Sequence, residues 1–210
     1  MSDISLWRQI QEDWIAHEKD WTKPGFRAVA VHRFGVWRMS VQPKLVRAPL
    51  SMFYRAMYRR VRNVYGIELP YTVKLGRRVV FEHQGGVVIH GYSEIGDDSI
   101  IRQGVTLGNR HLDCPLDAPV LGCKVNVGAG AAIMGKVVLE DGCAVGANAV
   151  VIHDVAAGDT VVGIPARSIN RASAQSKPQV SNSDAVVDEV IDEVIDGTVA
   201  ETQSNSIPQP

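Results

Sequence analysis

His83 is the side chain whose type and surroundings best suit catalysis, within the run FEHQGG at residues 81–86. A neutral imidazole near physiological pH can take a proton from an alcohol. The two glycines that follow clear space beside the ring, and we expect the ring to lie away from the core that Phe81 enters. A lone histidine on a strand surface is also an ordinary solvated residue, so the hypothesis depends on its neighbours.

The candidate partner of this imidazole is a carboxylate earlier in the chain, Glu68. The interval between the two, fifteen positions, is close to one circuit if three six-residue repeats close a coil. Glu68 would then face His83 across a corner, fix its tautomer and stabilise the imidazolium. Glu82 is the competing partner, but adjacent residues on a strand point to opposite faces.

The elements that must position these residues come from a six-residue repeat within residues 69–167. Branched aliphatic residues recur every six positions, and four positions after each comes a small or β-branched residue. Neither a helix nor a single strand has this period, which is typical of a parallel β-helix. The aliphatic positions are Leu121, Val127, Ile133, Leu139, Val145 and Val151, and the small ones are Val125, Ala131, Val137, Cys143, Ala149 and Val155.

Glycines and one interruption mark the corners of these coils. Glycine follows the aliphatic position at several corners, where it would ease a tight or positive-φ turn. The stretch 109–120 breaks the repeat, because the interval from Leu107 to Leu121 exceeds two repeats by two positions. An excursion from a solenoid is a natural binding loop. The corner glycines are Gly76, Gly96, Gly108, Gly128 and Gly146.

Residues 1–67 contain all four tryptophans and carry apolar residues at helical spacing. We expect these helices to cap the open end of the β-helix. From Arg27 to Arg62 the chain has nine Lys or Arg and no carboxylate. The favoured interpretation is a packed cap whose arginines bind a partner subunit or solvent. The alternative is peripheral membrane association, with residues 27–62 against anionic head groups.

Composition limits the remaining classes. The net charge is −1, so the bulk charge expected for nucleic-acid binding is absent. No apolar run approaches the roughly 18–20 residues of a membrane span, and the polar N-terminus is unlike a secretory signal. We therefore expect a cytoplasmic protein, at the inner face of the membrane if the basic segment binds lipid. The three cysteines lack zinc-binding spacing, no metal is expected, and Cys143 is predicted to be a buried thiol.

The hexad array ending in VVGIPARSI resembles the left-handed β-helix acyltransferases, and within them the serine acetyltransferase family. The matching runs are FEHQGG, IRQGVTLGN at 101–109, VNVGAGAAIMG at 125–135 and GIPAR at 163–167, and GFRAVAVHRFGVWRM at 25–39 resembles the family's helical domain. The predicted fold is mainly β: a helical region over 1–67, a left-handed parallel β-helix over 68–169, and a disordered acidic tail over 170–210.

The resemblance implies acetyl-CoA as the donor, three repeats per coil, and a homotrimer with active sites between subunits. His83 matches the family's catalytic histidine, and Glu68 matches the position of its paired aspartate. The pantetheine arm is expected along corners of small residues, and Arg167 could reach a CoA phosphate. The cofactor-binding candidates are Gly108, Gly128, Ala129, Gly146, Ala147 and Arg167.

The acceptor loop departs from the family. Serine acetyltransferases carry Asp-Arg-His-Pro there, and the arginine and histidine help to hold serine; this chain reads LDAP at 116–119. Desolvating a serine carboxylate beside Asp117 without a cation is unfavourable. We therefore predict acetylation of a hydroxyl in a sugar or polysaccharide precursor, as in the colanic-acid-type acetyltransferases whose NRH-type loop this one resembles, with L-serine as the alternative. The acceptor-binding candidates are Glu82, Asn109, Arg110, His111 and Asp117.

Smaller features complete the predictions. Asp20 is the candidate counterpart of the family's serine-contacting aspartate, and the ending SIPQP argues against docking into cysteine synthase. A metalloenzyme using His83, His90 and His111 and a non-catalytic scaffold are remote alternatives. His17, His32 and His153 are expected to have structural or solvent-facing roles.

Overall fold

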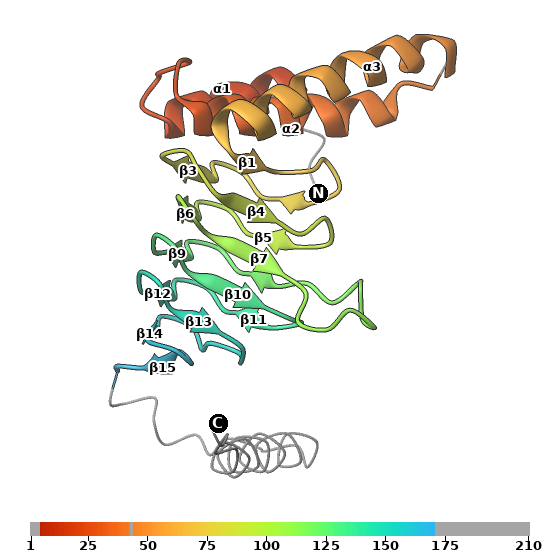
Figure 1. Ribbon diagram of the computed structural model, residues 1–210. Helices are drawn as coiled ribbons and strands as arrows, with labels where there is room; N and C mark the ends of the chain where they lie inside the picture. The colour runs from red at the N-terminus through yellow and green to blue at the C-terminus, as the bar shows by residue number, and fades with distance from the viewer. Residues whose placement is uncertain (1–4, 43, 171–210) are drawn as a thin grey trace, which may run out of the picture. The chain divides into compact units, whose positions relative to one another are not determined.

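The computed structural model describes residues 5–42 and 44–170, and the predicted acidic tail lies outside these residues except for Asn170. Three helices form one layer: α1 (Leu6–Ala16), α2 (Pro24–Ser40) and α3 (Lys44–Arg60), the last continued by a π-helical turn η1 (Val61–Tyr65). Figure 1 shows this layer lying across one end of a stack of short strands, with β15 at the other end.

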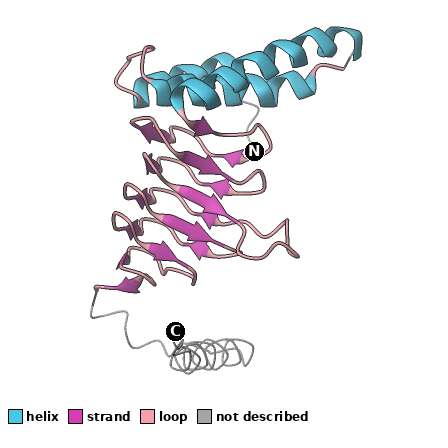
Figure 2. Ribbon diagram, in the orientation of Figure 1, coloured by secondary structure: helices cyan, strands magenta, loops and turns pink. Residues whose placement is uncertain are grey.

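The strands build a parallel β-helix with three faces (Figure 2). Every strand pair is parallel except β14 with β15, which is antiparallel. The first sheet contains β1 (Ile67–Glu68), β4 (Val87–Ile89), β7 (Thr106–Gly108), β10 (Ala132–Met134) and β13 (Val150–Val151). The second contains β2 (Lys74–Leu75), β5 (Glu94–Ile95), β8 (Val120–Leu121) and β11 (Val138–Leu139). The third contains β3 (Val80–Glu82), β6 (Ile100–Arg102), β9 (Asn126–Val127), β12 (Ala144–Val145), β14 (Thr160–Val162) and β15 (Arg167–Ser168).

The six-residue pattern explains the core, as predicted. Each repeating aliphatic residue from Leu121 to Val151 is at most 3% exposed, and each small residue from Val125 to Val155 is at most 5% exposed. Burial of such side chains is the main favourable contribution to folding. Cys143 is fully buried, and loss of hydration raises the pKa of its thiol to about 11. The predictions of the fold and of this buried thiol are confirmed.

The interruption at 109–120 is larger than the sequence spacing indicated. Leu107 on β7 and Leu121 on β8 lie on consecutive strands of one coil. Thr106 pairs with Ala132 across the coil that holds this stretch, and Ala132 pairs with Val150 across the next coil. The coil from Thr106 to Ala132 is therefore eight residues longer than the coil from Ala132 to Val150. The prediction of a two-residue excess is therefore wrong.

Close approach between coils, and not positive φ, explains the predicted corner glycines except Gly108, where a Cβ would meet only the flexible end of Met134 at 3.2 Å. None of the five predicted positions has positive φ. A Cβ on Gly76 would lie 2.6 Å from the Asp97 nitrogen, and one on Gly128 would lie 2.6 Å from the Ala147 nitrogen. Successive corners pack too tightly there for any side chain. The prediction of tight corners is confirmed at Gly76, Gly96, Gly128 and Gly146, and the positive-φ explanation is wrong at all five positions.

A buried ion pair joins the helical layer to the first coil. The Arg33 guanidinium on α2 donates to the Asp13 carboxylate on α1 at 2.8 Å, and their side chains are 6% and 1% exposed. Arg33 also donates to the carbonyl oxygens of Leu75 (2.8 Å) and Gly76. The Asp13 carboxylate accepts a further bond from the Arg78 N–H at 3.1 Å. This cluster connects α1, α2 and the corner after β2.

Replacing Asp13 with Ala should lower the free energy of unfolding by about 3–5 kcal/mol, because the Arg33 charge would stay buried without its partner. Asp13→Asn should cost less, since an amide oxygen still accepts the Arg33 and Arg78 bonds. Urea unfolding measures both. Asp113→Ala, at an exposed loop position, is the control. An equal, small loss in Asp13→Ala and Asp113→Ala would contradict this role.

Candidate active site

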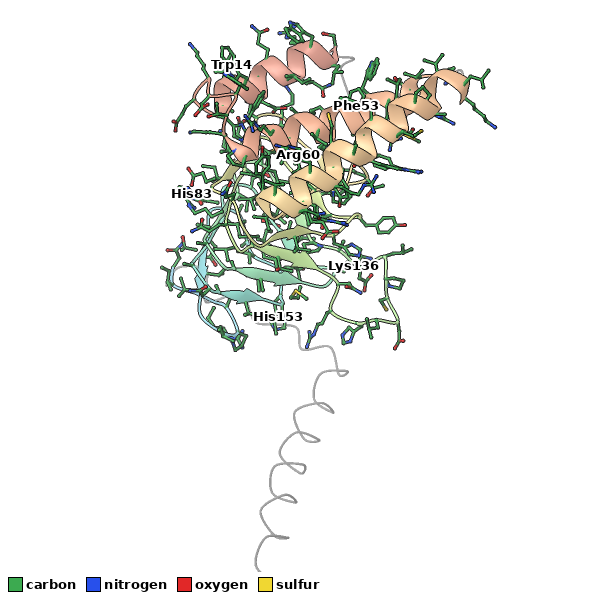
Figure 3. The ribbon with its side chains drawn as sticks, turned by 45° about the horizontal axis from the view of Figure 1, so that its top comes forward. Trp14, Phe53, Arg60, His83, Lys136 and His153 are labelled. Atoms are coloured by element: carbon green, nitrogen blue, oxygen red, sulfur yellow. The ribbon has the colours of Figure 1, made fainter. Side chains whose placement is uncertain are left out.

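His83 lies at the edge where the third sheet turns into the first, just after β3 (Figure 3). Its backbone has φ +65°, and Gly85 and Gly86 continue the turn with positive φ. L-residues rarely adopt that conformation. The side chain is exposed, whereas Phe81 is 2% exposed and points into the core. Within the described residues the imidazole has no hydrogen bond or ion pair. The turn therefore presents an unpaired imidazole at the surface, which is the state that a general base requires.

Glu68 does not contact His83 in this structure. It lies on β1 opposite Val88, and its carboxylate accepts a hydrogen bond from the Tyr58 hydroxyl at 3.4 Å. Burial and the Glu68 charge raise the pKa of Tyr58 to about 12, so the phenol is a stable donor. The first coil is also longer than three six-residue repeats, because Ile67 pairs with Val87. The interval from Glu68 to His83 therefore falls short of a full circuit.

Glu82 already has a charged partner in the next coil. Its carboxylate lies 2.9 Å from the Arg102 guanidinium, which also donates to the Asn126 side chain one coil further on. Arg102 was not singled out from sequence. Arg102 could have been identified only by knowing that the first coil is longer than three six-residue repeats, because that extra length places Glu82 opposite Arg102.

The His83 edge also collects most of the predicted CoA-binding residues. Glu82 pairs with Arg102, Ile101 with Val127, and Val127 with Val145. The N–H groups of Gly104, Gly130 and Asn148 donate to the carbonyls of Gly85, Gln103 and Ala129, so Gly85, Gln103, Ala129 and Ala147 form a column, one per coil. His83 lies just before this column, in the turn where the first coil is longer than the second. Gly128 and Gly146 occupy the adjacent column. Gly108 is the last residue of β7, at another edge, and Arg167 is exposed on β15.

This edge offers hydrogen-bonding groups that the β-helix itself does not use. Gly128 and Gly146 donate their N–H groups to Val145 and Val161, so their amides serve coil stacking. Within the described part of the chain, the N–H groups of Ala129 and Ala147 donate no hydrogen bond. The Gln103 Oε1 atom is buried without a partner. Sequence reasoning missed Gln103, since only the register shows that it lies one coil below the turn that holds His83.

The loop of residues 109–119 leaves a different edge, where the first sheet turns into the second. Its turns are internal: Asn109 donates from Nδ2 to the His111 carbonyl at 3.0 Å, and the Asp117 N–H donates to Cys114 at 3.1 Å. Arg110 and His111 are exposed, and Asp117 forms no ion pair with any described residue. The structure therefore does not bring this loop to His83 within one chain. Leu112 and Leu116 are 93% and 65% exposed at its tip.

The helical layer contains a cavity that lies apart from the candidate active site. Its volume is about 330 Å³, and none of the predicted site residues lines it. Its lining includes Trp21, Arg27 and Tyr65. Among residues 5–42 and 44–170, no group of three His, Cys, Asp or Glu side chains could hold a metal ion. No helix in those ranges is long and apolar enough to cross a bilayer.

Two other histidines are buried structural residues, as predicted. His17 has Nδ1 2.7 Å from the Asp13 carbonyl oxygen, and its Nε2 accepts the Phe81 N–H at 3.4 Å. His32 donates from Nε2 to the Val73 carbonyl at 3.0 Å. Burial lowers the pKa of both rings, that of His32 to about 4 with a contribution from the Arg33 charge. His153 is exposed, and Asp20 accepts hydrogen bonds from Thr22 in a turn.

A parallel β-helix of six-residue repeats, covered by N-terminal helices and presenting a histidine at one edge, defines the class of hexapeptide-repeat acyltransferases. No protein-family model matches the chain. Individual relatives do: the chain is 37% identical to a serine acetyltransferase of Helicobacter pylori over 171 residues, covering 80% of this chain and 95% of that protein. A serine acetyltransferase of Synechococcus elongatus is 34% identical over 168 residues, which are 78% of this chain and 66% of that one.

Solved structures agree with the sequence relatives. Soybean serine acetyltransferase complexed with serine matches with a TM-score of 0.67 and 31% identity, over 80% of this chain and 71% of that one. The Brucella abortus enzyme in complex with coenzyme A matches with a TM-score of 0.64 and 25% identity, over 78% and 66% of the two chains. The chain belongs to the serine acetyltransferase family and is an acyltransferase.

The buried His32 should make stability depend on pH. Its pKa is about 4 when folded and about 6.5 when unfolded. Between these values the unfolded chain binds a proton that the folded chain does not. Stability should therefore fall as pH falls from about 6.5 to about 4, by up to roughly 3 kcal/mol from this residue. Urea unfolding across this pH range should give a flatter profile for His32→Gln, and an unchanged slope would contradict the assignment. Exposed His153→Gln is the control.

Proposed function

We propose that the protein is an L-serine O-acetyltransferase that uses acetyl-CoA. The observation that carries this is the similarity to the Helicobacter pylori serine acetyltransferase over almost all of that protein's length. The serine complex of the soybean relative and the coenzyme A complex of the Brucella relative support the two substrates. The preference for a sugar acceptor, drawn from the loop sequence, has no support among these relatives, and the serine alternative agrees with them better.

The His83 edge fits the pantetheine arm of CoA. That arm carries two amides, whose carbonyl oxygens need donors. Ala129 and Ala147 present unused N–H groups one coil apart, and their small side chains leave the backbone accessible. The exposed Arg167 guanidinium donates only to its neighbouring Ala166 carbonyl among the described residues, and it remains able to bind a phosphate. We assign these residues to the donor, and Gly128 and Gly146 to the close coil packing beside them.

His83 acts as the general base in this proposal. Its imidazole takes the proton of the serine hydroxyl as that oxygen attacks the thioester carbonyl carbon. Collapse of the tetrahedral intermediate breaks the carbon–sulfur bond, and the imidazolium gives its proton to the departing CoA sulfur. Because His83 has no hydrogen-bond partner among the described residues, its imidazole is free to accept the hydroxyl proton and then to donate it to the sulfur. Glu68 is assigned to orienting the imidazole, which requires it to exchange its Tyr58 contact for His83.

The assembly is proposed to be a homotrimer with shared sites. His83 lies at one edge of the three-sided β-helix, and the acceptor loop leaves a different edge. One chain therefore cannot bring them together, whereas a neighbouring chain can place its loop beside the His83 edge. Leu112 and Leu116 are exposed at the loop tip and give such a contact an apolar part.

A sugar hydroxyl is the second candidate acceptor, because of one observation in the loop. Asp117 forms no ion pair with a described residue, and Ala118 is 6% exposed. Neither can bind the serine carboxylate at the position where the family has arginine and histidine. For serine, that carboxylate must instead use Arg110 or His111, whereas a sugar needs only neutral hydrogen bonds.

Replacing His83 with Ala should lower kcat by at least about 10²–10⁴-fold, because the hydroxyl loses its general base. The binding of CoA, measured by calorimetry, should stay unchanged, since the amide donors lie on other coils. His153→Ala is the matched exposed control and should keep full turnover. Near-wild-type kcat in His83→Ala would refute the assignment.

Mixing chains of two inactive variants tests whether the active sites are shared between subunits. Trimers re-formed from His83→Ala chains and Arg110→Gln chains should regain activity, because some sites would then combine an intact His83 with an intact neighbouring loop. Activity no higher than the average of the two pure variants would exclude sites shared between chains.

The acceptor should be identified by following thiol release from acetyl-CoA with L-serine and with a panel of nucleotide sugars. We expect turnover with serine, and Arg110→Gln should raise its KM roughly tenfold or more while changing kcat less, because a charged hydrogen bond is lost. Turnover with a sugar and none with serine would establish the second candidate. The exposed Lys136→Gln is the control for loss of a positive charge.

A further inference from the structure

The outward face of α3 is apolar where a helix on a protein surface is normally polar. Tyr54 packs inward and is 5% exposed, which fixes the buried side of the helix. On the opposite side, apolar residues follow one another at steps of four, three and four positions, so they form one stripe. Leu45 is 90% exposed and Met52 70% exposed. The stripe consists of Leu45, Pro49, Met52 and Ala56, with Val46 and Phe53 exposed beside it.

Unpaired positive charges border this stripe. At 100° per residue, Arg55 and Arg59 lie on one side of it and Arg60 on the other. Together with Lys44 they are exposed, and none forms an ion pair with a carboxylate among the described residues. Nor does the sequence supply one nearby, since no Asp or Glu occurs from Arg27 to Arg62. Figure 3 shows α3 on the outer side of the helical layer, with Phe53 and Arg60 labelled.

From this arrangement we propose that the outward face of α3 binds the surface of an anionic lipid bilayer, as a helix lying in the interface. The apolar stripe would enter the boundary between head groups and acyl chains, and the flanking arginines would extend to the lipid phosphates. Each cation near an anionic membrane adds to the attraction. This inference is independent of the acceptor and of the catalytic role of His83.

Charge favours a bilayer over a second copy of the chain. A twofold contact places the same surface on both partners, so residue pairs repeat symmetrically. Two α3 faces would bring the arginines of both copies, Arg55, Arg59 and Arg60, into one contact with no carboxylate on the element to compensate. An anionic bilayer supplies both requirements of the face at once: negative charge for the arginines and an apolar layer for Leu45 and Met52.

Sedimentation of the full chain with vesicles tests this proposal. We expect binding to phosphatidylcholine vesicles that contain phosphatidylglycerol, weak binding without it, and release by high salt. The double variant Arg55→Gln/Arg59→Gln should lower the vesicle association constant roughly 25-fold, about fivefold for each arginine. Leu45→Ser/Met52→Ser should lower it roughly tenfold or more, through lost apolar burial.

The matched control is Lys124→Gln/Lys136→Gln, which removes two exposed charges from the β-helix and should leave vesicle binding unchanged. Thermal unfolding and CoA binding of each variant show that the fold is intact. The proposal is overturned by absence of binding to anionic vesicles, by equal binding to neutral ones, or by full binding of either α3 variant. If Leu45→Ser/Met52→Ser instead changes the oligomeric mass and vesicles do not bind, the face contacts protein.

Discussion

Register between successive coils is the constraint on which the rest of this structure depends. Each strand is only two or three residues long, so it gains order only from parallel pairing with the coils above and below. The extra residues of the longer coils are accommodated at corners, so Val127 still pairs with Val145 and Glu82 with Arg102. For this reason the turn that holds His83 stays on one edge with Ala129 and Ala147, although they are far apart in sequence. The candidate site is a property of one edge of the β-helix.

The first coil has no coil beyond it to pair with, and polar side chains of the helical layer bind its unpaired backbone N–H and C=O groups. A strand edge exposes N–H and C=O groups that cost free energy if they are buried without partners. His17 accepts the Phe81 N–H, His32 donates to the Val73 carbonyl, and Arg33 donates to Leu75 and Gly76. Helices cannot extend a β-ladder, so these side chains take the place of the missing coil. Buried polar residues in the helices are therefore a direct consequence of capping a solenoid.

Sequence reasoning succeeded where one local pattern determines the structure. The six-residue period identified the inward positions from Leu121 to Val151, because each must be aliphatic to fill the core. It failed where the outcome depends on coil length, since extra corner residues leave the burial pattern unchanged. The contact expected between Glu68 and His83 assumed shorter coils, and the Glu82–Arg102 pair was missed for the same reason. The Asp13–Arg33 pair joins separate helices, and no local pattern identifies such partners.

The charges of the acceptor loop bear on which substrate it suits. Serine is a zwitterion, so its binding site needs a cation for the carboxylate and an anion for the ammonium group, each with its hydration replaced. A sugar hydroxyl needs neither. Arg110 and Asp117 supply one charge of each sign within the same loop, and neither forms an ion pair with a described residue. If the carboxylate binds Arg110, Asp117 can hold the ammonium group and its negative charge becomes favourable. Under the proposed serine acetyltransferase function, Arg110 would take the role of the family's arginine, and Asp117 would oppose serine binding only if it faced the carboxylate instead of the ammonium group.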